Sequence, residues 1–129
     1  MLLVVDTNII VNALLSRNEG AESLKLMDDI YNGVHRMCVS SAIMDEYRDV
    51  LSRPQFHIPP EICDELIRWI DDNALHIEPL STTQHEVEMN DEDDRVFFDT
   101  AKCVHARLVT RNYKHYPVHE LVTLIDELY

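Results

Sequence analysis

The stretch LLVVDTNIIVNALL, residues 2–15, combines four apolar residues, one aspartate and a second apolar segment that contains two asparagines. Its first part, residues 2–5, has no polar alternation and ends in two valines, which is typical of a strand covered on both faces in a parallel sheet. Asp6 then stands at the carboxyl end of that strand, the edge at which ligands bind in open parallel sheets. Because aspartate also caps helices well, a cap and a functional carboxylate are both open interpretations of Asp6.

Strand-like and helical segments alternate along the chain. The predicted strands cover residues 2–5, 36–40, 75–80, 107–110 and 119–124. The predicted helices cover residues 7–16, 21–32, 41–53, 60–73 and 92–106. Strands that are mostly separated by helices indicate an α/β fold with a parallel, twisted sheet of about five strands and helices on both faces. Because the chain has 129 residues, 46% of them hydrophobic, we expect one domain over residues 1–129.

The charge balance and the cysteines restrict the class of protein. Eleven basic and 24 acidic side chains give a formal charge of −13, whose long-range field repels nucleic acid. The charge therefore counts against a protein that coats nucleic acid, whereas metal ions can neutralise a local site for RNA. Cys38, Cys63 and Cys103 form no CxxC pair, which argues against a disulfide framework or a zinc site and fits a reducing cytoplasm. No apolar run approaches membrane-spanning length, so no membrane partner is expected.

Glu46 and Asp94 are the other acidic residues that the sequence pattern brings toward the core. Glu46 borders a buried stripe with i, i+4, i+7 and i+8 spacing, formed by Ile43, Tyr47, Val50 and Leu51. Asp94 lies in the first turn of a helix that buries much of its surface, and Asp99, five residues later, is expected at the same cleft edge. The alternatives are a glutamate that bends out to water and a solvated acidic turn over residues 86–94.

A carboxylate cluster at one edge of the sheet would result if Asp6, Glu46 and Asp94 converge. Like charges a few ångströms apart raise one another's pKa, and a hard divalent cation such as Mg²⁺ relieves that repulsion. A bound cation also activates water and stabilises the charge that builds on a phosphate. The predicted chemistry is phosphodiester hydrolysis.

Four segments in this order resemble one known family: VVDTNI near the start, SSAIMDEYRDVLSRP in the middle, then DEDDRVFFDTAK and LVTRNYKHYP. The chain resembles the PIN-domain ribonucleases, in particular the VapC-like toxin components of bacterial toxin-antitoxin modules, over nearly its whole length. The resemblance implies a PIN-like three-layer fold, a ribonuclease that depends on Mg²⁺ or Mn²⁺, and Asp6, Glu46 and Asp94 as catalytic, metal-binding acids. An RNA substrate is implied, and a small antitoxin protein and a homodimer are compatible partners.

The sequence departs from the family pattern after the 107–110 strand. Many members have a fourth acid there, whereas this chain has Asn112, a neutral and weaker ligand for Mg²⁺. Two alternatives follow: Asp99 supplies the missing charge, or three acids suffice and Asn112 positions water or a ligand. The third acid is either Asp93 or Asp94, and counting back seven residues from Ala101 favours Asp94.

Several other polar residues are assigned supporting roles. Asn8, Asn12, Thr110 and Asn112 are expected to orient the carboxylates through hydrogen bonds. The segment TRNYKHYP, residues 110–117, offers cations for phosphates and tyrosines for stacking on unpaired bases. We therefore predict RNA contacts at Arg111, Lys114 and His115, with a surface loop that pairs with nearby acids as the alternative.

Two other functions compete with the ribonuclease. A phosphatase or phosphotransfer domain with a nucleophilic Asp6 needs a further carboxylate two residues later, or an acidic pair beside it plus a later lysine. The chain has Asn8 at that position, and no lysine follows a suitable strand. An inactive PIN-like binding module agrees with the charge of −13 and with Asn112, and a nuclease assay with metal separates it from the enzyme.

Overall fold

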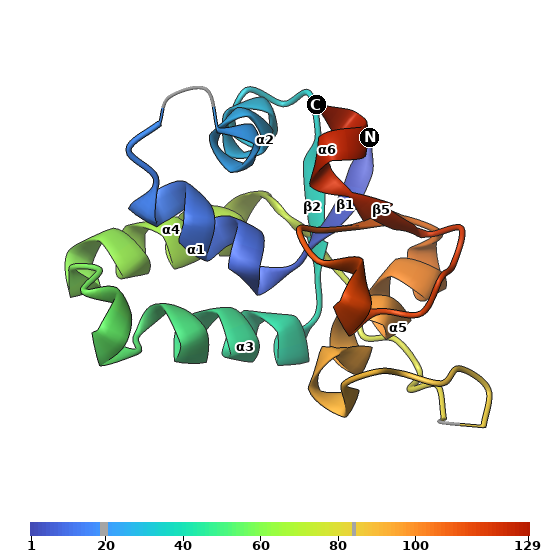
Figure 1. Ribbon diagram of the computed structural model, residues 1–129. Helices are drawn as coiled ribbons and strands as arrows, with labels where there is room; N and C mark the ends of the chain where they lie inside the picture. Colours follow the sequence, from blue (N-terminus) through green and yellow to red (C-terminus); the bar gives the residue numbers. More distant parts are fainter. Residues whose placement is uncertain (19–20, 84) are drawn as a thin grey trace.

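The computed structural model describes residues 1–18, 21–83 and 85–129 (Figure 1). The strands are β1 (Leu2–Val5), β2 (Arg36–Val39), β3 (Leu75–His76), β4 (Arg107–Thr110) and β5 (Val122–Leu124). The α-helices are α1 (Thr7–Leu15), α2 (Glu22–Tyr31), α3 (Ser41–Leu51), α4 (Pro60–Asn73), α5 (Arg95–Val104) and α6 (Ile125–Leu128). Three short 3-10 turns are η1 (Pro54–Phe56), η2 (Glu92–Asp94) and η3 (Tyr113–His115).

The five strands form one parallel sheet in the order β3-β2-β1-β4-β5. Figure 1 shows α1 to α4 on one side of this sheet and α5 on the other, so the predicted α/β fold with two helical layers is confirmed. β1 lies in the middle, and Leu3, Val4 and Val5 are completely buried. A strand enclosed on both faces and both edges needs apolar residues at every position, which explains the unbroken apolar run.

The predicted strand at residues 75–80 is shorter in the structure. Only Leu75 and His76 pair with β2, and the amide of Ile77 makes one further bond to the carbonyl of Val39. Pro79 has no N–H to donate, and an edge strand has a partner on one side only, so pairing ends early. At the other edge, residues 119–121 are not part of β5, and residues 125–128 form α6 instead of a short tail.

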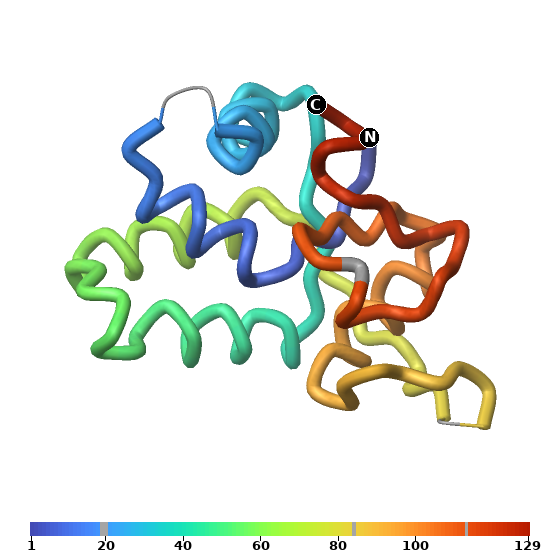
Figure 2. Tube along the Cα trace, in the orientation of Figure 1, coloured from blue at the N-terminus to red at the C-terminus, as the bar shows by residue number. Residues whose placement is uncertain are grey.

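The two ends of the chain lie near each other beside the end of α2 (Figure 2). The amino terminus donates to the carbonyl of Val34 at 3.2 Å, and the Tyr129 hydroxyl donates to Asp29. None of the helices in the described part of the chain has the length and apolar character to cross a membrane. The three cysteines are free thiols.

Tyr47 fixes α3 against the end of β1. Its ring is completely buried, and its hydroxyl donates to the carbonyl of Val5 at 2.6 Å. At the start of the same helix, the Ser40 hydroxyl accepts from the amide of Ile43 at 3.2 Å and caps it. These two contacts set where Glu46, the neighbour of Tyr47, stands relative to the end of β1.

We expect Tyr47→Phe to lower the free energy of unfolding by about 1–2 kcal/mol, because the Val5 carbonyl loses a buried donor. Urea denaturation monitored by circular dichroism measures the change. Tyr31→Phe is the matched control, because the Tyr31 side chain is 70% exposed. Equal stability of the two variants would show that the Tyr47 hydroxyl does not hold α3 in place.

Candidate active site

Asp6 lies at the carboxyl end of β1, between β2 and β4, where the strand order reverses. This is the position at which open parallel sheets form a crevice for ligands. The Asp6 side chain is 3% exposed, and the Thr110 hydroxyl at the end of β4 donates to its Oδ2 at 2.8 Å. Asp6 occupies the N-cap position of α1 but makes no side-chain capping bond. Of the two interpretations that the sequence left open, the cap is therefore not realised.

The environment of Asp6 opposes its charge. Burial raises the pKa of the carboxyl above its ordinary value. The Thr110 hydrogen bond, the charge of His115 and the backbone amides of Asn8 and Thr7 act in the opposite direction without cancelling the effect of burial. The fold thus shields the Asp6 carboxylate from water, and the hydrogen bond and nearby charges replace only part of the lost solvation.

Glu46 is half-buried on α3, beside the stripe that the sequence predicted. The four residues of the stripe are all buried: Ile43, Tyr47, Val50 and Leu51. Burial raises the pKa of Glu46, as do the charges of Asp49, Asp93 and Asp6, whereas Arg53 lowers it. Glu46 therefore belongs to the electrostatic surroundings of Asp6, although it comes from a different layer of the fold.

Asp94 ends η2 and stands directly before α5, with its side chain 16% exposed. Burial raises the pKa of Asp94 to about 7, and the next largest cause is the charge of Asp6. Glu46 raises this pKa further, and His115 lowers it. The Nδ1 atom of His115 is 3.5 Å from Asp94 Oδ2, which is an ion-pair distance without hydrogen-bond geometry.

The other acids of the 86–94 run have structural roles or are exposed. Asp91 Oδ1 accepts from the amide of Asp93 at 3.0 Å and caps η2. Glu92 forms two hydrogen bonds of 2.7 and 2.8 Å with the buried Arg95 guanidinium. Asp93 is exposed, although its charge acts on Glu46. Burial and coupling to Asp6 thus distinguish Asp94 from Asp93.

The structure does not bring Asp99 to this group of acids. Its Oδ1 accepts from the amide and the hydroxyl of Thr82, at 3.2 and 2.5 Å, and its Oδ2 accepts from the Ser81 hydroxyl at 3.3 Å. Asp99 fastens the long connection that precedes η2 to α5. Its placement differs from the expected cleft edge because five residues along a helix turn a side chain well over a full turn away.

The asparagines expected to orient the carboxylates face elsewhere, whereas Thr110 does contact Asp6. Asn112 Oδ1 accepts from the amide of Lys114 at 3.0 Å, so it shapes the turn after β4. Asn8 is exposed and Asn12 half-buried. Together with Arg111 and Asn112 they line a groove of about 450 Å³ next to the acids.

The predicted RNA contacts divide into two kinds. Arg111 and Lys114 are exposed and free to meet a phosphate, whereas His115 faces Asp94. Tyr116 is 2% exposed, so it does not stack on bases as the sequence suggested. The side chain of Tyr113 lies outside what the structure describes. The tertiary fold thus removes one of the two predicted stacking residues.

Three buried polar atoms without a hydrogen-bond partner gather around the acids. Within the described residues they are Thr7 Oγ1, Asp94 Oδ2 and the Tyr116 hydroxyl; burial raises the pKa of Tyr116, and the charges of Asp6 and Asp94 raise it further. Sequence patterns gave no signal that Tyr116 is buried near Asp6 and Asp94, because only the fold carries residue 116 back to residues 6 and 94. Buried polar atoms are rarely left unpaired, so these atoms indicate a place for a polar occupant.

A divalent cation fits this set of groups because it relieves the repulsion between Asp6, Glu46 and Asp94 and engages the unpaired oxygen of Asp94. Among the residues that the structure describes, no three Asp, Glu, His or Cys side chains are already arranged to hold a metal ion. The side chains converge without adopting a coordination geometry.

Comparison with known proteins agrees with this geometry. The sequence pattern of the PIN domain family matches residues 2–114. The chain belongs to the PIN domain family. Members are in general nucleases and generally use divalent metals. A search of curated proteins found no match.

Two solved structures resemble this PIN domain. One is VapBC2 from Rickettsia felis, solved bound to a DNA fragment from its promoter, with 16% identity, a TM-score of 0.60, and coverage of 96% of this chain and 97% of the other. The second is FitAcB from Neisseria gonorrhoeae, with 17% identity, a TM-score of 0.55, and coverage of 89% and 90%. At these identities the likenesses establish the fold.

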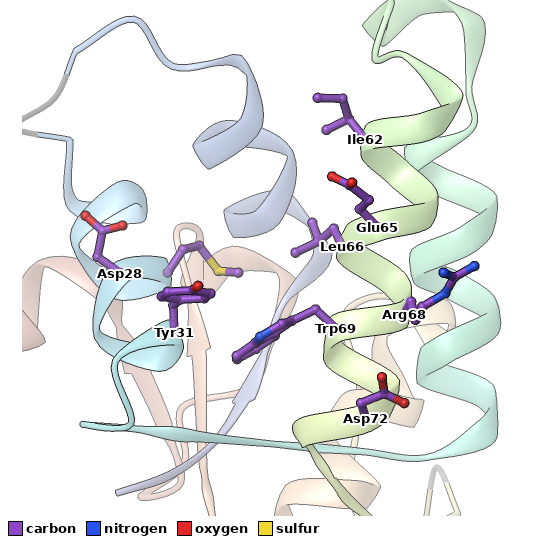
Figure 3. Close-up of a pocket in the computed structure, with 9 residues that line it drawn as sticks. Asp28, Tyr31, Ile62, Glu65, Leu66, Arg68, Trp69 and Asp72 are labelled. Carbon is purple, nitrogen blue, oxygen red and sulfur yellow. The ribbon is translucent and has the colours of Figure 1, made fainter.

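A second surface of the PIN domain is an apolar groove between α2 and α4 (Figure 3). The Tyr31 and Trp69 rings are 5.6 Å apart, and Tyr31 and Ile62 are 70% and 46% exposed. The apolar side of α4 that faces the groove is therefore only partly covered. The charged residues that line the groove are three acids and one arginine: Asp28, Glu65, Asp72 and Arg68.

The raised pKa of Asp94 predicts a pH dependence of stability in buffer with EDTA. The pKa of Asp94 is about 7 in the folded protein and has an ordinary value of 3.8, so folding favours the neutral form of this carboxyl. The free energy of unfolding therefore falls as the pH rises from 4 to 7 and Asp94 must ionise in its buried position. The loss is up to about 4 kcal/mol, at about 1.36 kcal/mol per pH unit.

Thermal unfolding at several pH values measures this effect as a difference between variants. Asp94→Asn becomes progressively more stable than the wild type from pH 4 to 7. Asp126→Asn, at an exposed position on α6, gives a difference that does not change with pH. Parallel curves for the wild type and Asp94→Asn would contradict the raised pKa of Asp94.

Proposed function

We propose that this PIN domain is a metal-dependent endoribonuclease that acts in the cytoplasm as the toxin of a toxin-antitoxin module. The observation that carries the proposal is the electrostatic coupling of Asp94 to the buried Asp6 at the carboxyl edge of the sheet, where Asp94 Oδ2 accepts no hydrogen bond from the described residues and has only the His115 ring at 3.5 Å. The rival inactive binding module has no need of acids that are buried against one another at a cost in stability. The likeness to solved VapBC2 and FitAcB supports the fold that this function uses.

Asp6, Glu46 and Asp94 would together hold Mg²⁺ or Mn²⁺. A bound divalent ion supplies an activated water and stabilises the charge that develops on a phosphate. Thr110 fixes the rotation of the Asp6 carboxylate through its 2.8 Å hydrogen bond. His115 offsets part of the negative charge beside Asp94. With Asp99 bound to Ser81 and Thr82, the proposed ligand set contains three acids.

The substrate contact is small and local. A net charge of −13 repels a long duplex, whereas Arg111 and Lys114 are exposed beside the acids. We therefore assign single-stranded or looped RNA as the substrate, since a short unpaired segment reaches the acids without lying along the acidic surface.

The antitoxin partner is assigned to the apolar groove between α2 and α4. Apolar side chains of Tyr31, Ile62 and Trp69 form its floor, and acids outnumber arginine around it. Apolar area of this kind on a monomer marks an interaction surface. Charge complementarity selects a segment with an apolar stripe flanked by Lys or Arg, so the partner is a small basic protein.

Removing a ligand acid should abolish cleavage more than it weakens binding. We expect Asp6→Asn and Asp94→Asn to lower kcat on a structured RNA pool about a hundredfold or more, the loss typical when transition-state charge stabilisation is removed. Gel analysis of purified protein with Mg²⁺ or Mn²⁺ measures the rate, and EDTA is expected to stop it.

Asp126→Asn is the control for this assay, because it removes an acid at an exposed position on α6. Cleavage that resists EDTA, or that both site variants retain, would overturn the mechanism. No cleavage by the wild type with either metal would favour the inactive binding module.

The groove assignment predicts that a small basic protein, encoded beside this chain, is found and binds the wild type. Ile62→Glu should weaken that binding at least tenfold, because it places a charge among apolar contacts. Leu80→Glu is the matched control, since Leu80 is 93% exposed and lies outside the groove. Isothermal titration calorimetry measures both, and equal affinities would reject the groove as the docking site.

A further inference from the structure

The groove lined by Asn8, Asn12, Asn112 and Arg111, which we call the amide groove, lies beside the acids. It runs between α1 and the turn after β4, with Leu15 and Phe56 among its other lining residues. Its volume of about 450 Å³ is within the range of small-ligand sites. Three carboxamides on one groove are a hydrogen-bonding surface that the core does not require.

The free donors and acceptors of this groove face solvent. Among the described residues, the side chains of Asn8 and Asn12 make no hydrogen bond, and both stand four residues apart on one side of α1. Asn112 uses its Oδ1 for the amide of Lys114 and keeps its NH₂ group available. The exposed Arg111 adds one positive charge to a surface that is otherwise uncharged.

Both walls of the amide groove are anchored at Asp6. On one wall, Asn8 follows Asp6 by two residues at the start of α1. On the other wall, the amide of Asn112 donates to the Thr110 hydroxyl at 3.2 Å, and that hydroxyl donates to Asp6 at 2.8 Å. A molecule seated in the groove is therefore positioned relative to the acid cluster.

We propose that the amide groove binds one unpaired RNA nucleotide next to the phosphate that is cleaved, and so sets the sequence preference of the enzyme. Carboxamides offer the paired donor and acceptor that read a base edge. Phe56 offers an aromatic ring on which a base can stack, and Arg111 offers a cation for the adjoining phosphate. This inference rests on the proposed ribonuclease function.

Binding of short single-stranded RNA tests the groove apart from cleavage. The probes are fluorescein-labelled eight-nucleotide RNAs of A, C or U alone, titrated with the whole protein in EDTA and followed by fluorescence anisotropy. We expect the wild type to prefer one of the three RNAs. Asn12→Ala and Phe56→Leu each weaken binding of the preferred RNA about tenfold, and Asn12→Ala also reduces the preference.

Arg111→Ala separates phosphate contact from base reading. It weakens all three RNAs by a similar factor and lowers the slope of log affinity against log salt by about 0.7. Asn32→Ala and Arg17→Ala are the matched controls, because both residues are exposed and lie outside the groove. Each control binds RNA as the wild type does.

The outcomes distinguish the groove from the ribonuclease function. The groove proposal is wrong if the Asn12→Ala and Phe56→Leu proteins bind every RNA like the wild type and cleave with an unchanged preference in Mg²⁺. That result would leave the proposed ribonuclease function intact. RNA binding that depends on the groove, without metal-dependent cleavage, would support the groove and overturn the enzyme. Groove variants that lose the small basic protein and keep RNA binding would also overturn the inference.

Discussion

Burial of one carboxylate at the end of the central strand is the constraint on which the rest of the structure depends. Asp6 is 3% exposed at the point where the strand order reverses. Water cannot solvate it, so the surrounding elements must supply its partners. β4 supplies the Thr110 hydroxyl, and η2 ends in Asp94, whose negative charge repels that of Asp6. The layers around β1 are therefore arranged about a charge that they only partly compensate.

This arrangement lowers the stability of the fold around Asp6. Asp94 has an unpaired oxygen and a pKa raised to about 7, and Tyr116 has a buried hydroxyl without a partner. Such groups reduce stability when no ligand engages them, and they cluster at functional sites because a ligand can repay their cost. By contrast, Arg95 and Asp99 have many partners and fix the segment that carries Asp94. The well-bonded side chains of Arg95 and Asp99 thus hold in place the segment that carries the poorly compensated Asp94.

The two proposed binding grooves of the molecule differ in chemistry in a way that suits two different occupants. The groove between α2 and α4 is apolar and surrounded by acids, which favours a basic protein segment. The amide groove is polar, contains Arg111 and adjoins Asp6, which favours a short piece of RNA. An overall charge of −13 agrees with both proposed roles, because such a field attracts basic segments and repels extended nucleic acid.

The sequence by itself determined the alternation of strands and helices and the burial of the first strand, and it singled out Asp6, Glu46 and Asp94 as candidate acids. Local periodicity and the apolar run encode these features, because they depend on neighbours in the chain. Only the tertiary structure decided that Asp99 binds Ser81 and Thr82, that Tyr116 is buried and that Asn8 faces a groove. Residues separated by up to 104 positions meet there, as Thr110 meets Asp6. Which partner each side chain meets depends on how the layers pack, and no local pattern contains that information.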